Sequence, residues 1–325
     1  MTSVCLPPSF SAATVYCLPK TGSPSSGLDY RPIALLNTDY KIYSRILLQR
    51  LQAQLGCLVS PTQYGFVPGR QVHDALDIWS ALQARAKTGD FPQAALAVLL
   101  DFSKAYDSLD RRFLSLALQR HGFPRALVSA VEALHLGTTA RFVVDGDLST
   151  VEEVACGIRQ GCPLAPTLFI LAADVLYDML DLDGRLQGLP LSDTTSVTTV
   201  GYADDTTVYL DSPDEAPALA ECLTSFAAVS GLKVNPAKCT AVFLRRQDPK
   251  NPTPSLPFPV AAPDQLVRYL GRQIASAPTA ELLWQTSLQH IRARLHLAEI
   301  KTTDVLQRVQ TPTFSTQLRV VRLPY

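Results

Sequence analysis

Two aspartates stand side by side in the stretch TSVTTVGYADDTTVYL, residues 195–210. The β-branched and aromatic residues on both sides predict two strands joined by a tight connection. The Asn-Gly or Asp-Gly pair typical of such a connection is absent, and Asp204 and Asp205 stand near the expected tip. Adjacent carboxylates repel each other. The pair is therefore either a solvated surface turn or a site that uses its negative charge for chemistry.

A third aspartate closes a separate apolar run, AALAVLLD, residues 94–101. A continuous run of this length predicts a strand buried on both faces, with Asp101 at its carboxyl end. An antiparallel sheet could place Asp101 beside the hairpin tip, although Asp101 and Asp204 lie 103 positions apart. Three carboxylates in one place would suit Mg²⁺, which prefers hard oxygen ligands.

Charge is unevenly distributed along the 325 residues, although 29 basic and 29 acidic side chains cancel. Residues 1–70 carry a net charge of +4, residues 71–244 carry −10, and residues 245–325 carry +6. An acidic centre can hold a divalent cation, and basic ends can hold phosphates. Ordinary surface scatter remains the alternative explanation. With 47% hydrophobic and 18% charged residues, the chain is expected to fold.

Cysteine and histidine usage argues against a zinc site or a disulfide framework. The seven cysteines are scattered without a C-x-x-C pair, which favours reduced thiols in an intracellular protein. The five histidines show no metal-binding spacing. No run approaches the ~18 apolar residues of a membrane span, and residues 1–10 do not resemble a secretory signal. Nucleus and cytoplasm both stay open.

Hydrophobic periodicity and end signals predict the elements that must position the acids. The predicted helices cover residues 39–55, 72–87, 110–121, 124–136, 162–180 and 214–230, followed by a basic helical segment from residue 284. The predicted strands lie within residues 94–101, 141–146, 150–155, 197–200, 206–209 and 239–244. Residues 19–27 are predicted to form an exposed loop. This order predicts an α+β fold with an antiparallel sheet and helices on one face.

Two of these helices have a predicted buried face. In the helix over 39–55, which we expect to stop at Gly56, the face is Ile42, Ile46, Leu47 and Leu51. In the long helix over 162–180, the core stripe is Leu164, Leu168, Leu171, Val175 and Met179.

Several motifs, in order, resemble those of reverse transcriptases. The stretches that resemble palm motifs are LDFSKAYDSL (100–109), GIRQGCPLAPTLF (157–169), GYADD (201–205), SGLKVNPAKC (230–239) and RYLG (268–271). The stretches that resemble fingers motifs are CLPK (17–20), YRPIALLNTDYKIYSRILLQRL (30–51) and QYGFVPGR (63–70). YADD alone would be weak evidence for this family, but the whole set of motifs in order is specific to it. The motifs resemble most those of non-LTR, LINE-type retrotransposons.

The resemblance implies a right-hand polymerase architecture with fingers, palm and a partial thumb. It predicts an N-terminal extension over 1–15, fingers over 16–92, palm over 93–275 and a partial, basic helical thumb over 276–325, with 16–275 as the whole reverse transcriptase domain. The thumb helix would carry Arg292 and Arg294 beside an apolar set, Leu288, Ile291, Leu295 and Leu297.

The resemblance also implies an RNA-directed DNA polymerase that extends a DNA primer on an RNA template with dNTPs. Asp101 and Asp204 would bridge two Mg²⁺ ions, with Mn²⁺ as an alternative ion, and Asp205 would have a less direct role. The backbone carbonyl of Phe102 could add a ligand. The RYLG hairpin would grip the primer, and Ala203 must be small and could sit in a strained turn.

Further roles are implied around the nucleotide. Lys20 and Arg31 resemble residues that grip the triphosphate, and a solvated surface is the alternative. Tyr106 resembles the aromatic residue that excludes a 2′-OH, with a plain core tyrosine as the alternative.

Two more implied roles concern a loop and a lysine. Gln160 and Gly161 resemble a motif that contacts nucleotide and template, and an ordinary helix-entry loop is the alternative. Lys238 could protonate the leaving pyrophosphate, or it is a simple surface lysine.

One departure and two other functions stay open. The motif PLAP places Ala165 where a serine is usual, and we expect little effect from the lost hydroxyl. Related element proteins also carry further domains, so the chain could be a truncated, non-catalytic remnant that folds and binds RNA. A metal-dependent nuclease is a third possibility.

Overall fold

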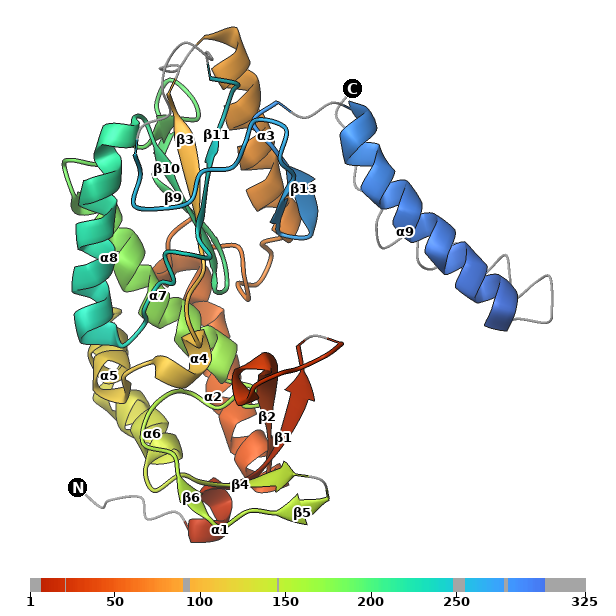
Figure 1. Cartoon of the computed structure of the whole chain (residues 1–325). Coiled ribbons are helices and arrows are strands. Elements are labelled where there is room, and N and C mark those ends of the chain that lie inside the picture. The colour runs from red at the N-terminus through yellow and green to blue at the C-terminus, as the bar shows by residue number, and fades with distance from the viewer. Residues whose placement is uncertain are drawn as a thin grey trace.

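The computed structural model describes residues 7–20, 22–89, 94–144, 146–247, 255–277 and 280–301. The predicted fingers–palm boundary at residues 92 and 93, and the end of the predicted thumb beyond residue 301, lie outside these ranges. Figure 1 shows one strand group with long helices beside it, a second strand group near the N-terminus, and one helix standing apart.

The central sheet is antiparallel throughout, as the sequence predicted. Its strand order is β11 (Thr240–Phe243), β3 (Leu96–Leu100), β10 (Asp205–Leu210) and β9 (Thr199–Tyr202). Thr206 pairs with Leu100 across β10 and β3, and Asp205 pairs with Tyr202 across the hairpin. The carboxyl end of β3 therefore lies beside the amino end of β10.

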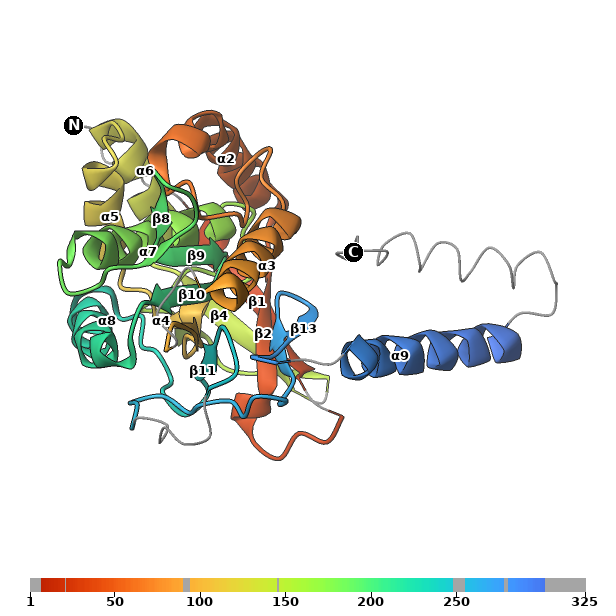
Figure 2. The same cartoon turned by 90° about the horizontal axis from the view of Figure 1, so that it is seen from above.

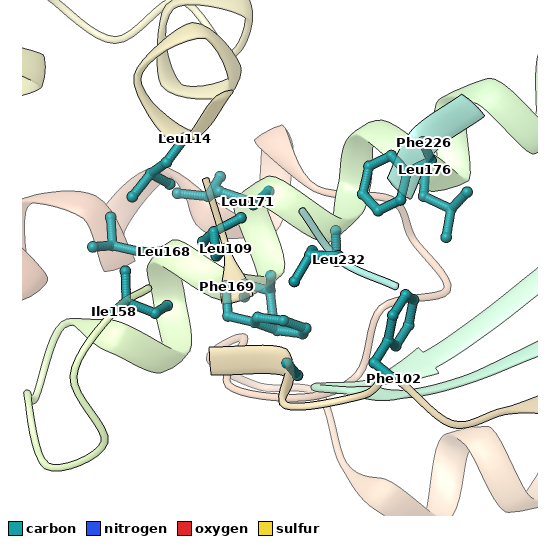
Figure 3. Packing of buried hydrophobic residues seen from close by; sticks show 14 of the residues in the cluster. Phe102, Leu109, Leu114, Ile158, Leu168, Phe169, Leu171, Leu176, Phe226 and Leu232 are labelled. Atoms are coloured by element: carbon teal, nitrogen blue, oxygen red, sulfur yellow. The ribbon is translucent and has the colours of Figure 1, made fainter. Parts of the chain in front are cut away.

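Four helices share a large apolar core with one face of this sheet. They are α5 (Arg111–Arg120), α6 (Arg125–His135), α7 (Ala165–Leu182) and α8 (Ala216–Ser230). Figure 3 shows Leu168, Phe169, Leu171 and Leu176 of α7 among residues from the other elements, Phe102, Leu109, Leu114, Ile158, Phe226 and Leu232. The short helix α4 (Ala105–Ser108) lies between β3 and α5.

The buried surface of α7 is wider than the predicted stripe. Leu164, Leu168 and Leu171 are buried as predicted, whereas Val175 and Met179 are only half-buried. The reason is that α7 runs through the middle of the molecule, so residues outside the stripe, such as Ile170, are also enclosed. A helix enclosed on nearly all sides has no single apolar face.

The opposite face of the sheet is also covered, which the prediction of helices on one face omitted. The helix α3 (Val72–Thr88) packs there together with the hairpin of β12 (Val267–Tyr269) and β13 (Arg272–Ile274). Trp79 of α3 contacts Tyr269 of β12, with ring centroids 6.0 Å apart. α3 covers the helix predicted over residues 72–87 and ends at Gly89, which has the left-handed backbone of a helix C-cap (φ 89°).

The second sheet joins distant parts of the chain. It contains β1 (Ala12–Pro19), β2 (Tyr30–Leu36), β4 (Thr139–Val144), β5 (Asp147–Leu148) and β6 (Glu152–Glu153). β1 pairs with β2 antiparallel and with β4 parallel. No strand was predicted over residues 12–19, because the β-formers Thr14, Val15 and Tyr16 make only a short run in a Pro-, Gly- and Ser-rich segment.

The helix α2 (Thr38–Leu58) differs from its prediction in two ways. It continues through Gly56, so glycine does not stop it. Its buried face contains Leu47 and Leu51 but not Ile42 and Ile46, which are 55% and 43% exposed. The other buried positions are Tyr40, Ser44 and Leu55. The buried face is therefore rotated about the helix axis relative to the predicted one. It includes Tyr40 and Ser44 in place of Ile42 and Ile46, because the apolar pattern alone did not reveal that a tyrosine and a serine would be buried.

The remaining elements are short, apart from α9. They are α1 (Pro8–Ser11), the 3-10 helices η1 (Gly27–Asp29) and η2 (Pro213–Glu215), the strands β7 (Leu189–Pro190) and β8 (Ser196–Val197), and α9 (Ala280–Lys301). Figures 1 and 2 both show α9 standing away from the other elements. Within the described ranges, no helix has both the length and the apolarity to cross a bilayer.

Candidate active site

The hairpin between β9 and β10 has a two-residue tip. Because Asp205 pairs with Tyr202, only Ala203 and Asp204 connect the strands. Ala203 has a left-handed backbone (φ 60°), as the predicted strained turn requires, and it is buried. The turn is held by Gln63, whose side-chain Oε1 accepts a hydrogen bond from the Ala203 amide at 3.1 Å. Asp204 is thereby presented to solvent at the tip.

Asp101 and Asp205 lie side by side at one end of the two central strands, a place called the sheet edge below. Asp101 follows the last residue of β3 and Asp205 begins β10, so the register that pairs Thr206 with Leu100 brings positions 205 and 101 side by side. Both line a cavity of about 150 Å³, together with Lys238 and Arg268. Segments far apart in the sequence thus deliver two acids and two cations to one place.

Asp101 and Asp204 disfavour the ionisation of Asp205. Packed protein around Asp205 raises the pKa of its carboxyl, the charges of Asp204 and Asp101 raise it further, and Arg268 lowers it. Asp204 also acts on Tyr106, whose pKa rises to about 12, mainly through burial and in part through this charge. The three acids and Tyr106 therefore share one electrostatic environment.

The donor chemistry of this edge fits a hard divalent cation, because carboxylate oxygens crowd together and repel. Among the described residues, however, no three histidine, cysteine or acidic side chains form a group close enough to hold an ion. Asp101 and Asp205 share the cavity, while Asp204 stands on the tip beside them. The Phe102 side chain is buried in the core (Figure 3).

The segment before β11 supports Asp101 from behind. The Asn235 amide donates to the Asp101 carbonyl at 2.8 Å, and the Asp101 amide lies 3.5 Å from the Cys239 Sγ. The Lys238 amide donates in turn to the Asn235 carbonyl at 3.0 Å. Lys238 is exposed and borders the cavity. The backbone thus fixes Asp101 and leaves the lysine side chain free to turn toward it.

A second group of predicted residues surrounds the loop before α7. The Gln160 carbonyl accepts a hydrogen bond from the Ala34 amide of β2 at 2.7 Å, and the Gln160 side chain donates to both oxygens of Asp107 at 3.3 Å. Gly161 has φ 121°, and a Cβ there would lie 2.3 Å from the Ala34 carbonyl oxygen. Glycine is therefore required where this loop meets β2.

Tyr106 belongs to both groups. Its ring stacks on Phe169 of α7, with ring centroids 5.0 Å apart, and its carbonyl accepts from the Ile158 amide at 2.7 Å. The side chain is half-buried and within electrostatic reach of Asp204. Because Phe169 fixes the Tyr106 ring, the tyrosine offers a rigid surface to a ligand bound beside the acids.

The predicted triphosphate-binding residues lie on the second sheet. Lys20 follows β1 and Arg31 lies on β2, and both are exposed. Lys20 helps to lower the pKa of Asp107, although burial raises it overall. Lys20 thus acts electrostatically on Asp107, and Asp107 in turn accepts hydrogen bonds from Gln160 in the loop before α7. Arg31 lies on β2, where it pairs with Leu18 of β1.

Sequence reasoning missed three residues that shape the site: Gln63, Asp107 and Arg268. Each lies inside one of the motifs QYGFVPGR, LDFSKAYDSL and RYLG. The motifs indicated that these segments matter, but not what each of the three side chains does. None of the three roles could be predicted from the sequence, because each partner comes from another part of the chain.

A family model described as "Reverse transcriptase (RNA-dependent DNA polymerase)" matches residues 18–274. That range contains every residue discussed at the site.

Retroelement proteins are similar to the chain in sequence. An uncharacterized 149 kDa protein of transposon TX1 from Xenopus laevis is 30% identical over 239 residues, which is 73% of this chain and 18% of that protein. The Pol polyprotein of the type-2 retrotransposable element R2DM from Drosophila melanogaster is 29% identical, over 74% of this chain and 22% of its own length. The RNA-directed DNA polymerase of the mobile element jockey, from the same species, is 28% identical, over 82% and 29%. The chain thus spans less than a third of each relative.

Solved telomerase structures share the fold. Apo telomerase from Candida tropicalis has a TM-score of 0.59 and 12% identity, covering 85% of this chain and 49% of that one. Telomerase from Candida albicans with a fragment of telomeric RNA has a TM-score of 0.55 and 10% identity, covering 94% and 53%. At such identities the likeness concerns the fold alone.

Proposed function

Because the chain belongs to the reverse transcriptase family, we propose that it is an RNA-directed DNA polymerase of a non-LTR retroelement. It would extend a DNA primer 3′-OH with dNTPs on an RNA template. The family and the right-hand polymerase architecture predicted from the motifs are confirmed. Reverse transcriptases use divalent metal ions, and the fit of this chain's residues to such ions carries the proposal.

The observation that carries it is the position of Asp101 and Asp205 on one cavity, with Asp204 on the adjoining hairpin tip. The raised pKa of the Asp205 carboxyl has its origin in burial and in the two neighbouring acids. A fold keeps such mutually unfavourable charges where a ligand neutralises them. The strained Ala203 turn supports the same conclusion, because strain of this kind collects at functional sites.

Two Mg²⁺ ions, with Mn²⁺ as an alternative, would be held by Asp101, Asp204 and Asp205 and by the Phe102 carbonyl. When bound, magnesium supplies an activated primer hydroxyl and a countercharge for the triphosphate. Asp101 and Asp204 would be the principal ligands, and Asp205 would have a less direct role. The supporting observation is their shared electrostatic environment, with Asp101 and Asp205 in one cavity.

The chain's other residues would bind and orient the nucleotide. Lys20 and Arg31 would contact the triphosphate as exposed cationic donors. Tyr106, fixed by Phe169, would lie under the incoming sugar and exclude a 2′-OH. These assignments are supported by the exposure of the two cations and by the position of Tyr106 within reach of Asp204.

Two further assignments complete the proposal. Gln160 and Gly161 would contact nucleotide and template where their loop meets β2. Lys238 would donate the proton that the leaving pyrophosphate needs, and its place at the rim of the acid cavity supports this role. The proposed division remains extension 1–15, fingers 16–92, palm 93–275 and thumb 276–325.

Primer extension tests the proposal. The chain is incubated with poly(rA)/oligo(dT), dTTP and Mg²⁺, alongside Asp204→Ala and the control Asp193→Ala, which removes an exposed carboxylate from the loop before β8. We expect extension by the chain and by Asp193→Ala, and none above background by Asp204→Ala. Equal incorporation by all three proteins, or none by any, would reject catalysis at this site. RNA binding without extension would indicate a non-catalytic remnant instead.

A further inference from the structure

Gln63 is a fully buried polar side chain in the loop between α2 and α3. Its Oε1 accepts from the Gly65 amide at 2.8 Å and from the Ala203 amide at 3.1 Å, and its Nε2 donates to the Tyr177 hydroxyl at 3.2 Å. Because two amide donors face the oxygen, the orientation of the side-chain amide is fixed. One glutamine therefore connects a loop that precedes the palm, the strained turn and α7.

The hydrogen bonds continue from Gln63 to the strand that starts with Asp205. The Tyr177 hydroxyl, fully buried in α7, lies 3.1 Å from the Thr206 Oγ1. Since this hydroxyl oxygen accepts from Gln63, its own proton is available to donate to Thr206. The network thus holds the residue before the two acids, Ala203, and the residue after them, Thr206.

The loop and the hairpin are in contact without spare room. A Cβ on Gly65 would lie 2.2 Å from the Ala203 nitrogen, and a Cβ on Gly201 would lie 1.8 Å from the Tyr177 hydroxyl oxygen. The backbones also bond directly, because the Tyr64 amide donates to the Gly201 carbonyl at 2.7 Å and the Gly201 amide donates to the Thr62 carbonyl at 3.0 Å. The turn can move only if the loop over 62–65 moves with it.

We propose that Gln63 is a positioning residue for polymerisation, which sets the place of Asp204 and Asp205 through Ala203 and Tyr177. This inference rests on the proposed function, because it assigns Gln63 to the same reaction. Gln63 touches neither substrate nor ion. It acts by holding the left-handed Ala203 backbone, which costs energy that its hydrogen bond to the amide offsets.

The principal test replaces Gln63 with methionine, which keeps the length and removes all three hydrogen bonds. We expect kcat for dTTP incorporation to fall on the order of 100-fold, because small misplacements of catalytic groups have effects of this size. KM for dTTP stays near that of the unmodified chain, and the Mg²⁺ concentration needed for half-maximal rate rises severalfold. Tyr177→Phe, which breaks only the distal half of the network, should give a smaller loss in kcat.

A matched control separates positioning from loss of stability. Thr138 is equally buried, and its hydroxyl donates to the Val154 carbonyl and accepts from Arg111 beside β4. Thr138→Val should lower Tm as Gln63→Met does, yet leave the rate per folded molecule and the Mg²⁺ requirement unchanged. Equal losses of kcat in both variants at equal loss of Tm would overturn the proposal.

Hydrogen exchange gives a readout that does not depend on activity. In the unmodified chain, the peptide over 199–208 should exchange slowly, and Gln63→Met should speed its exchange at least tenfold while Thr138→Val leaves it unchanged. Unchanged exchange in Gln63→Met overturns the positioning role even if the chain extends no primer. Absent extension by the unmodified chain rejects only the proposed function.

Discussion

Two clusters of like charge in this protein are treated in opposite ways. At the sheet edge, Asp101, Asp204 and Asp205 crowd together, and repulsion raises the pKa of Asp205. Around the start of α5 and the end of α6, Arg111 and Arg159 lie near His135, and burial and both arginines lower the pKa of His135 to about 4. Both clusters cost electrostatic energy, but only one is compensated from within the fold.

The cationic cluster is compensated by backbone carbonyls. Arg111 donates to the carbonyls of Gly157, His135 and Cys156 at 2.7–3.3 Å. Arg159 donates to the Ser11 carbonyl at 2.7 Å and lies over the Tyr40 ring, 4.7 Å from its centroid. These charges join α1, α6 and the loop before α7 into one structure.

Within the part of the chain that the structure describes, the carboxylates of the acidic cluster have no comparable set of hydrogen bonds. Arg268 lowers the pKa of Asp205 only in part, and the hydrogen bonds of Gln63 hold the backbone rather than the carboxylates. The difference teaches how to separate a scaffold from a site in this fold. Buried charges that find partners in the chain stabilise it, whereas partly exposed acids that crowd together, as here, are candidates for binding a ligand.

The substitution Asp205→Asn tests the contrast between the two clusters most strongly. It should lower primer extension on the order of 1,000-fold, because it removes a carboxylate from the proposed metal site. It should also raise Tm at pH 7, because an acid with a raised folded pKa is ionised at a cost to stability above its unfolded pKa. Activity and stability would move in opposite directions, as measured by extension assays and calorimetry.

The control for this variant is Asp193→Asn, on the exposed loop before β8. It should change neither quantity. A drop in Tm together with retained activity in Asp205→Asn would show that the acidic cluster is structural.

Arg111→Met tests the cationic cluster in the same way. It should lower the free energy of unfolding by about 3 kcal/mol, since three carbonyls and the Thr138 hydroxyl lose a charged donor. Extension per folded molecule should stay near normal. Denaturant unfolding gives the first quantity and active-site titration gives the second. Lost activity without lost stability would contradict the division drawn above.

A pH series sharpens the comparison through His135, whose Nδ1 donates to the Val131 carbonyl at 2.8 Å. Its folded pKa of about 4 lies below the ordinary value of 6.5, so the folded chain binds this proton less readily than the unfolded chain. Stability should therefore fall as pH drops below 6.5, by about 2 kcal/mol at pH 5.

His135→Gln removes this titration and serves as the control. Its free energy of unfolding should change less between pH 7 and pH 5 than that of the unmodified chain. Identical slopes in the two proteins would mean that His135 is not buried in neutral form.

Much of the fold could be predicted because local patterns determine it. Periodicity and end signals gave helices close to those observed, such as 110–121 for α5 and 214–230 for α8. In α5, the Phe113 amide donates to the side chain of the N-cap residue Asp110 at 2.7 Å. The strand ending at Asp101 followed from a single apolar run. The strand β1 gave no such pattern, because its stability comes from β2 and β4, which are distant in sequence.

The site, like the fold, has a part that could be predicted from local sequence and a part that could not. Residue types at Asp101, Asp204 and Asp205 were visible in the sequence, since acids at strand ends are rare enough to notice. The support beneath them was not, because Gln63, Tyr177 and Thr206 meet from separate elements with no shared period. A residue's chemistry can be predicted locally, whereas its partner is a property of the whole fold.

The smallest expected effect concerns Arg268, the cation that borders the acid cavity. Arg268 favours the ionised form of Asp205, so Arg268→Met should raise the pKa of that carboxyl further and move the acid limb of the pH–rate profile to higher pH. Because Arg268 is exposed, its charge is screened, and the loss should be only roughly two- to fivefold at the acid end. Arg272→Met, on the partner strand of the same hairpin, is the matched control and should leave the profile in place. If Arg268→Met lowers the rate equally at all pH values, the arginine contacts primer or template instead of tuning the acids, and the cluster depends on its ligand alone for compensation.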